Sequence, residues 1–289
     1  MADPSEISTV VAHALDVDVV AAVRLGGGDV AESFRVELAD GRSVFAKTHR
    51  DPPPHFFTTE AAGLEWLRAA DAALVAEVLA VGDDPAHLVL GWIDETRHSR
   101  ADDEVFGRQL AAVHRAGAPS FGRADRRTTG SLGVPNDPCD TWAEFYAERR
   151  LLPLAQLAMD RHVLPAATVR ELEAVAARLD QFGAADEPPS RLHGDLWAGN
   201  RVVDTEGRSW LIDPAAHGGH REFDLAMMQL FGGFAPETFV GYQDAHPLAD
   251  GWRDRVPLHQ LAPLTVHAIK FGGGYVAATQ RALHATLSL

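Results

Sequence analysis

The sequence predicts an α+β protein of two lobes: a small antiparallel β lobe over residues 1–93 and a larger, mainly helical lobe over residues 94–289. Three observations support this. Short strand patterns joined by tight turns fill the first third of the chain, and helical periodicity dominates from Asp102 onwards. Between the later helices, the stretch from Arg191 to Asp224 contains a short hairpin pattern flanked by carboxylates.

Bulk composition limits the classes of partner. Hydrophobic residues make up 46% and charged residues 23%, as in a folded globular protein. The net charge of −15 argues against nucleic acid or an anionic membrane as the main partner. A single cysteine excludes an intramolecular disulfide, and no signal peptide or membrane span is evident. We therefore expect a soluble cytoplasmic protein; the sequence leaves its oligomeric state open.

The first lobe begins with an amphipathic helix over residues 5–15 and a strand over residues 17–25. A second strand follows, in which apolar side chains alternate with polar ones over residues 34–38. Asp40-Gly41 is a favourable two-residue hairpin turn, and it leads into a third strand over residues 43–48.

Three consecutive glycines, Gly26, Gly27 and Gly28, join the first two strands. Both a Walker A loop and a dinucleotide-binding turn need a helix directly after the glycines, so this position excludes them. A glycine turn between two strands is instead typical of the flexible flap that covers the phosphates of ATP in kinase-like folds.

Lys47 ends the pattern Val-Phe-Ala-Lys, which is close to the third strand of kinases, where a lysine holds the α- and β-phosphates. Such a lysine needs a carboxylate to fix its position. Glu60 is the candidate, on a predicted helix that Thr58 or Thr59 could cap. Glu65 is the rival, but it points to a different face of that helix.

Two more strands, over residues 74–81 and 87–92, complete a five-stranded lobe. The last one runs into a polar crossover, which matches the hinge of a kinase. In that position the backbone carbonyl of Gly91 and the backbone amide of Ile93 would face the adenine edge.

The second lobe shows helical periodicity in most of its length. The segment from Ala116 to Pro138 is the exception: it is rich in Gly, Pro, Arg and Asp, and we expect an irregular insertion that faces the substrate. The expected helices cover residues 102–114, 142–152, 169–179, 223–231, 258–270 and 275–287.

Three oxygen-bearing side chains flank the hairpin pattern between Arg191 and Asp224. Asp195 and Asn200 precede the hairpin, and Asp213 ends it. Asp195 and Asn200 have the D-x-x-x-x-N spacing of a kinase catalytic loop. Phosphoryl transfer needs a carboxylate to receive the hydroxyl proton and hard oxygen ligands for Mg²⁺. We therefore predict Asp195 as the catalytic base and Asn200 with Asp213 as the metal ligands of a protein-kinase-like fold.

Two departures point away from protein kinases. The catalytic loop reads His193-Gly194-Asp195 instead of His-Arg-Asp, and Asp213 lies in Ile-Asp-Pro instead of Asp-Phe-Gly. Both are typical of small-molecule phosphotransferases of the aminoglycoside-kinase type. Within that group the chain closely resembles the fructosamine kinase (ketosamine-3-kinase) family. The resemblance spans nearly all of the chain and is most specific in Asp-Leu-Trp at 195–197, Leu-Phe-Gly-Gly-Phe at 230–234 and Phe-Gly-Gly-Gly-Tyr at 271–275.

This resemblance implies ATP-dependent, Mg²⁺-assisted phosphorylation of the 3-hydroxyl of a small ketosamine, of the fructosamine or ribulosamine type. The product is unstable and falls away, so the family is linked to deglycation. Trp197 is a candidate wall for the substrate, with core packing as the equal alternative. Asp224 is expected to brace the catalytic loop by accepting backbone N–H bonds.

Other acceptors stay open at this point. An aminoglycoside, choline or homoserine kinase would carry the same phosphotransfer residues. A module that binds nucleotide without catalysis is disfavoured, because Lys47, Asp195 and Asp213 are all present.

Overall fold

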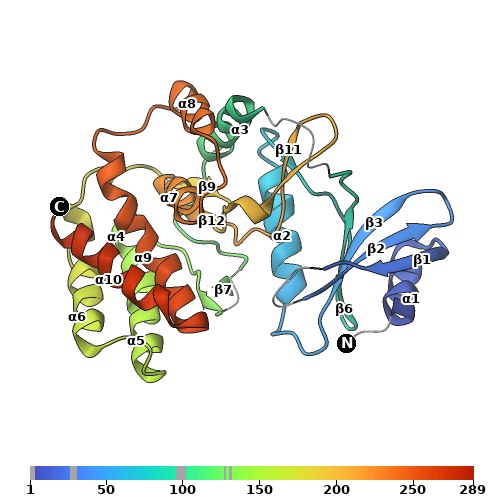
Figure 1. Cartoon of the computed structure of the whole chain (residues 1–289), viewed down its shortest axis with the longest axis horizontal. Coiled ribbons are helices and arrows are strands. Elements are labelled where there is room, and N and C mark those ends of the chain that lie inside the picture. The colour runs from blue at the N-terminus through green and yellow to red at the C-terminus, as the bar shows by residue number, and fades with distance from the viewer. Residues whose placement is uncertain (1–3, 27–30, 96–101, 127, 130–131) are drawn as a thin grey trace. The chain divides into compact units, whose positions relative to one another are not determined.

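The computed structural model describes residues 4–26, 31–95, 102–126, 128–129 and 132–289, and the chain divides into two compact units. The first comprises Met1–Asp102 together with Arg201–Pro214, and the second comprises Asp103–Asn200 and Ala215–Leu289. This division differs from a single boundary at residue 93, because the hairpin at 201–214 belongs to the first unit. Figure 1 shows the elements of both units.

The first unit is built on an antiparallel sheet of five strands in the order β1-β2-β3-β6-β5 (Figure 1). A tight turn joins β2 to β3, but the predicted two-residue turn at Asp40-Gly41 is wrong by one residue: Leu38 pairs with Arg42 and closes a loop of three residues over 39–41, with Gly41 at φ +87°. The strands are β1 (Val19–Arg24), β2 (Glu32–Leu38), β3 (Ser43–Thr48), β5 (Val78–Asp83) and β6 (Ala86–Gly91).

Two helices pack against this sheet. Helix α1 (Pro4–Leu15) buries Ile7 and Val11 in a core that includes Val44 and Ala46 of β3. Because side chains alternate along a strand, Lys47 points to the opposite face from Ala46. Helix α2 (Phe56–Arg68) supplies Glu60 to that lysine. The strand period therefore places Lys47 on the face of the sheet opposite to the one that α1 covers.

A second, smaller sheet explains why residues 201–214 belong to the first unit. Strands β10 (Arg201–Val203) and β11 (Ser209–Leu211) form the predicted hairpin. Strand β11 also pairs in parallel with β4 (Leu74–Val75), a short strand that follows α2. The two paired strands are far apart in the sequence, and the local sequence pattern of neither strand indicates the pairing.

The second unit is mainly helical. Helix α8 has no counterpart in the sequence analysis, and α9 starts earlier than expected and continues through Pro257 and Pro263. No helix in the described ranges is long and apolar enough to cross a membrane. The helices are α3 (Asp103–Arg115), α4 (Trp142–Tyr146), the π-helical turn Ala147–Leu151, α5 (Leu152–Asp160), α6 (Ala166–Ala176), α7 (Glu222–Phe231), α8 (Pro236–Ala245), α9 (Trp252–Phe271) and α10 (Gly274–Leu287).

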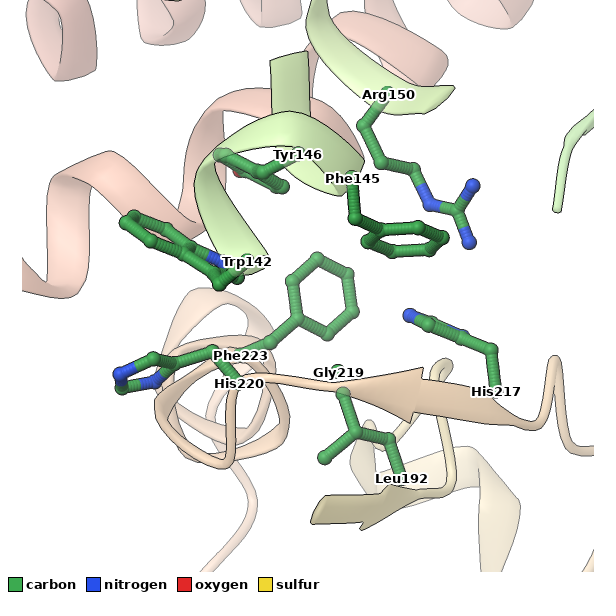
Figure 2. Close-up of a pocket in the computed structure, with 9 residues that line it drawn as sticks. All are labelled: Trp142, Phe145, Tyr146, Arg150, Leu192, His217, Gly219, His220 and Phe223. Atoms are coloured by element: carbon green, nitrogen blue, oxygen red, sulfur yellow. The ribbon is translucent and has the colours of Figure 1, made fainter. Parts of the chain in front are cut away.

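A two-stranded ladder in this unit carries the approach to the catalytic loop. Strand β9 (Ser190–Leu192) pairs with β12 (His217–Gly219), and α4 lies over the pair. A small cavity lies between them, and Figure 2 shows its aromatic lining with Phe223 at the centre and Arg150 and His217 at one side. The cavity contains none of the predicted site residues, so we assign it to the core of the unit.

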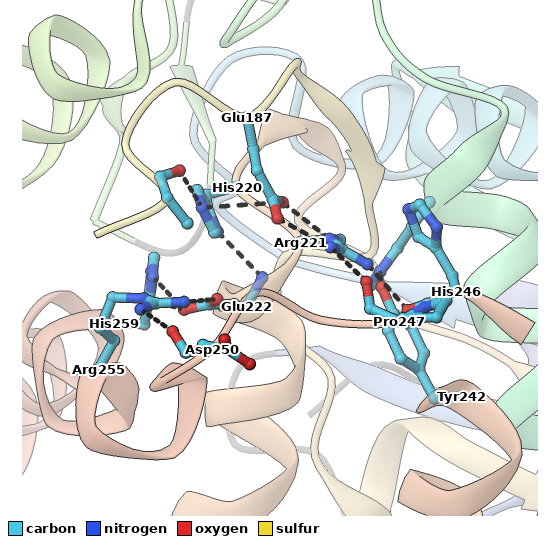
Figure 3. A network of polar contacts seen from close by, with 12 residues as sticks. Glu187, His220, Arg221, Glu222, Tyr242, His246, Pro247, Asp250, Arg255 and His259 are labelled. Carbon is cyan, nitrogen blue, oxygen red and sulfur yellow. Dashed lines mark hydrogen bonds and ion pairs between the residues drawn. The ribbon is translucent and has the colours of Figure 1, made fainter. Parts of the chain in front are cut away.

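A network of buried ion pairs ties the start of α7 to α9 and to the segment before β9 (Figure 3). Arg221 donates to both carboxylate oxygens of Glu187, at 2.7 and 2.8 Å. The next residue, Glu222, accepts two bonds from Arg255 at 2.9 and 2.6 Å. His259 lies 3.4 Å from the same carboxylate. Two adjacent charged residues thus hold the start of α7: Arg221 binds the segment before β9, and Glu222 binds α9.

The trio of His220, Glu222 and His259 has the composition of a metal site, but its hydrogen bonds do not favour one. The Nδ1 atom of His220 accepts from the Glu222 amide at 3.2 Å, and its Nε2 lies 2.9 Å from the carbonyl of Ala184. Both ring nitrogens are therefore engaged. Arg255 already balances the Glu222 charge, so this cluster is best described as an ion-pair network.

We predict that Glu222→Gln lowers the free energy of unfolding by about 3 kcal/mol at pH 7, because it leaves a buried arginine without its carboxylate. Burial alone would raise the pKa of Glu222, but bonds from His259 and Arg255 lower it to about 2. The depressed pKa means that this stabilisation is present above pH ~4.5 and is lost as the pH falls towards about 2. Urea unfolding at pH 7 and pH 3 measures both effects.

The matched control is Glu206→Gln, which breaks an exposed pair with Arg208 in the first unit. It should cost less than ~1 kcal/mol at either pH. A Glu222→Gln deficit of equal size at pH 7 and pH 3 would contradict the assigned role of this carboxylate.

Candidate active site

In the first unit, Lys47 lies between two carboxylates. Its ammonium group donates to Glu60 Oε1 at 2.8 Å and also forms an ion pair with Asp213. Strand β3 presents the lysine, α2 presents the glutamate, and the aspartate follows β11. The structure thus brings together three of the predicted site residues, and it selects Glu60 over Glu65 as the partner of the lysine.

The charges of this trio are coupled. Burial alone would lower the pKa of Lys47, but Glu60 and Asp213 outweigh it and hold that pKa above its ordinary value. Burial also raises the pKa of Glu60 to about 7; Lys47 opposes this rise and Asp213 adds to it. One buried cation is therefore shared by two acids, and it stays protonated at neutral pH.

Asp213 adopts a left-handed backbone conformation with φ +52°, two residues after the end of β11. Such a conformation is uncommon for residues other than glycine, although Asp tolerates it better than most. It turns the chain sharply at the point where the aspartate meets Lys47. Strained backbone of this kind is concentrated at functional sites.

The other nucleotide-site residues of the first unit have these positions. Gly26 lies in the bend after β1, whereas Gly27 and Gly28 fall outside the described residues. Gly91 ends β6, and its amide donates to the Glu77 carbonyl at 2.8 Å. Ile93 follows two residues later, as a hinge position requires. The strand end at Gly91 thus lies where the sequence predicted it, whereas the glycine turn stays a prediction.

In the second unit, Asn200 is bonded to Asp195. Its amide nitrogen donates to the Asp195 carbonyl at 2.8 Å and to the carboxylate oxygen Oδ2 at 3.1 Å. Both residues belong to the loop between β9 and β10, and Asn200 ends a short 3₁₀ turn over Ala198–Asn200. Two residues that are five positions apart are thus held together by the fold of the loop.

This loop is anchored by Asp224, which is fully buried in the first turn of α7. One carboxylate oxygen accepts from the His193 amide at 2.7 Å and the other from the Gly194 amide at 2.9 Å. His114 contacts the same carboxylate at 3.2 Å and also the Tyr242 hydroxyl at 2.7 Å. The bracing role predicted for Asp224 is confirmed.

The pKa of Asp224 lies below its ordinary value. Burial alone would raise it, but the contacts with His114 and with the backbone amides favour the charged form and outweigh burial. The carboxylate is therefore ionised at neutral pH and can hold two backbone donors at once. His114 completes this arrangement through its contacts with Asp224 and Tyr242.

Gly194 is required by the geometry of the loop. Its φ is +79°, and a Cβ atom there would lie 2.1 Å from the carbonyl oxygen of Ala215. Any other residue would both strain the backbone and displace that neighbour. This explains why a glycine, instead of the arginine of protein kinases, precedes Asp195.

Trp197 projects from the same loop, and 42% of its surface is exposed. Its ring lies over Gly199, where an added Cβ would come within 2.2 Å of the indole. The indole is therefore not part of the buried core, and its role as a wall for the substrate stays a prediction.

The donor set suits a divalent cation such as Mg²⁺. Asp213 offers a carboxylate, and Asn200 uses its amide nitrogen, not its amide oxygen, in the bonds to Asp195. Carboxylate and amide oxygens are the hard ligands that Mg²⁺ prefers. Asn200 and Asp213 are therefore of the residue types that such a site needs, and the site itself stays a prediction.

Comparisons with known proteins identify the family of this chain. A family model described as fructosamine kinase matches residues 4–289. The probable ketoamine kinase of Thermus thermophilus is 36% identical over 265 residues, which cover 92% of this chain and 94% of that protein. A solved structure from Thermobifida fusca, assigned as a fructosamine-3-kinase, is 41% identical with a TM-score of 0.91, and the match covers 98% and 99% of the two chains.

The fold also occurs more widely. The structure of a thermostable mutant of an aminoglycoside phosphotransferase in complex with ADP and hygromycin B gives a TM-score of 0.64 at 14% identity, covering 98% of this chain and 97% of that chain. At this identity the likeness shows the fold alone, and it confirms the predicted protein-kinase-like architecture. The full-length family match and the two similar relatives show that this chain belongs to the fructosamine kinase family, whose members are ATP-dependent phosphotransferases.

Proposed function

We propose that this protein transfers the γ-phosphoryl group of ATP to the 3-hydroxyl of a ketosamine, and thereby starts the removal of the sugar from a glycated amine. The observation that carries the phosphotransfer is Lys47, held between Glu60 and Asp213. The ketosamine acceptor rests on membership of the fructosamine kinase family. The cytoplasm as its location stays a prediction from the sequence.

Lys47 would hold the phosphates, because a buried ammonium that stays protonated complements their negative charge. Glu60 fixes the direction of that ammonium. Asp213 and Asn200 would hold Mg²⁺ through their side-chain oxygens. When bound, Mg²⁺ neutralises charge that develops on the phosphate oxygens. The glycine turn at 26–28 and the strand end at Gly91 and Ile93 would bind the phosphates and the adenine.

Asp195 would accept the proton of the 3-hydroxyl as the sugar oxygen forms its bond to the γ-phosphorus. The bond between that phosphorus and the bridging oxygen breaks, and ADP leaves with the bonding electrons. Asn200 holds the Asp195 carboxylate through Oδ2. The exposed face of Trp197 would bind the sugar of the substrate.

The proposed acceptor is tested by release of ADP from Mg²⁺-ATP with a fructosamine, a ribulosamine, an aminoglycoside and choline. We expect turnover with the two ketosamines and none with the other acceptors. Turnover with the aminoglycoside or choline alone would contradict the acceptor and would leave the phosphotransfer residues unaffected.

The control for this panel is Asp195→Asn, which removes the proposed base. It should lower kcat on the ketosamine by about 10²- to 10⁴-fold, while ATP binding is kept, because Asp195 contacts the acceptor and not the nucleotide. Near-normal turnover by this variant would contradict the assignment of the base.

A second prediction separates Glu60 from its rival on the same helix. Glu60→Gln should lower kcat/KM for ATP by roughly 10- to 100-fold, because Lys47 loses the carboxylate that fixes its position. Glu65→Gln, at an exposed position of α2, should leave this value within a factor of about two. Equal effects of the two variants in steady-state kinetics would contradict the role of Glu60.

A further inference from the structure

A strip of five aromatic rings begins at the catalytic loop of the second unit. It consists of Trp197, Phe231, His267, Phe271 and Tyr275, and we call it the aromatic strip. The rings follow one another at short centroid distances: 6.3 Å from Trp197 to Phe231, 4.9 Å from Phe231 to His267 and 5.0 Å from His267 to Tyr275. Phe271 lies 5.6 Å from His267 and 6.0 Å from Tyr275.

The strip is open to solvent. Trp197, Phe231 and Phe271 are 42%, 37% and 52% exposed. In the ranges for which burial is described, these are the three exposed side chains among all Phe, Tyr and Trp residues. Single exposed apolar residues are common on a protein surface, but a contiguous group marks a binding site.

Packing fixes the strip to the catalytic loop. A Cβ at Gly233, just beyond the end of α7, would lie 2.5 Å from the Cβ of Ala198, so that segment lies directly against the loop. Phe231 is the last residue of α7. The strip therefore starts two residues after Asp195 and continues away from it along α7, α9 and α10.

The chain reversal between α9 and α10 brings the far rings together. Gly272 and Gly273 have φ values of +63° and +56°, which residues other than glycine rarely adopt. This turn allows Phe271 at the end of α9 and Tyr275 at the start of α10 to lie next to each other. The glycines of the Phe-Gly-Gly-Gly-Tyr segment thus have a structural role in building the strip.

His267 lies at the centre of the strip, and its imidazole is uncharged at neutral pH. Burial is the main cause that lowers its pKa, and Lys270 adds to this effect. Its Nδ1 lies 2.8 Å from the carbonyl of Pro263, and this contact fixes the imidazole at an angle of 42–48° to the rings of Phe231, Phe271 and Tyr275. A neutral imidazole can be covered by an apolar group without the cost of burying a charge.

We propose that the rings of the aromatic strip beyond Trp197 bind the amine substituent of the ketosamine, while Trp197 contacts the sugar, and that the enzyme prefers ketosamines whose substituent is aromatic. This inference rests on the proposed function. In a ketosamine the amine is attached two carbons from the carbon that bears the 3-hydroxyl. When that hydroxyl lies at Asp195, the substituent is necessarily close to the same loop, where the strip begins with Trp197. Offset or edge-to-face contacts with aromatic rings favour a flat substituent.

The test compares two ketosamines of the same sugar, the benzylamine adduct and the methylamine adduct. We expect the wild-type protein to have a higher kcat/KM for the benzylamine adduct, by about 10-fold, and Phe271→Ala to reduce this preference by about 3- to 10-fold. Tyr275→Ala should reduce it as well, so that the result does not depend on one variant. Because Phe271 is half exposed, its truncation should leave the thermal midpoint within a few degrees.

The matched control is Val240→Ala, at an equally exposed position of α8 outside the strip, which should keep the wild-type preference. Equal kcat/KM values of the wild type for the two adducts would overturn the inference and leave the proposed function standing. Turnover of neither adduct would contradict the proposed function, and with it the inference. A preference that Phe271→Ala keeps, together with loss of self-association in sedimentation, would instead show that a second copy covers the strip.

Discussion

The conformation of the catalytic loop depends on the hydrogen bonds that its backbone donates to the buried carboxylate of Asp224. This carboxylate receives the backbone amides of His193 and Gly194, one on each oxygen, and it is held by His114. These bonds make a charge that is fully buried favourable in the folded state, because a carboxylate with several hydrogen-bond donors keeps its ionised form. The position of Asp195, one residue later in the chain, follows from this anchor.

Ion pairs at the start of α7 hold Asp224 in position. Asp224 lies in the first turn of α7, and the two residues at the start of that helix form buried ion pairs with Glu187 and Arg255. The loop is therefore connected through one helix to the segment before β9 and to α9. The end of the same helix carries Phe231, the second ring of the aromatic strip. A single helix thus relates the proposed base to the proposed substituent site.

The sequence predicts best those features that follow from local periods and local spacing. The Val-Phe-Ala-Lys pattern predicts Lys47 on the third strand, helical spacing prefers Glu60 to Glu65, and a hairpin pattern precedes Asp213; the structure agrees on all three. The bracing role of Asp224 was also predicted, because a carboxylate in the first turn of a helix tends to accept backbone N–H groups.

The structural features that the sequence did not indicate mostly depend on contacts between segments that are far apart in the chain. The parallel pairing of β11 with β4 assigns residues 201–214 to the first unit, and the β9–β12 ladder aligns two segments that contain no strong strand pattern. Helix α8 was missed because its apolar face is short and its start is marked only by Pro236. The aromatic strip combines residues of three helices and one loop, so no single stretch of sequence reveals it.

The central claim is that Asp195 activates the 3-hydroxyl of a ketosamine for attack on ATP. The most direct test is the position of the phosphate in the product, determined by two-dimensional ³¹P–¹H correlation NMR after reaction of a fructosamine with Mg²⁺-ATP. The account predicts a correlation between the phosphorus and the proton on carbon 3 of the sugar, followed by loss of that signal as the free amine appears. A correlation to the proton of any other carbinol carbon, with a product that persists, would contradict it.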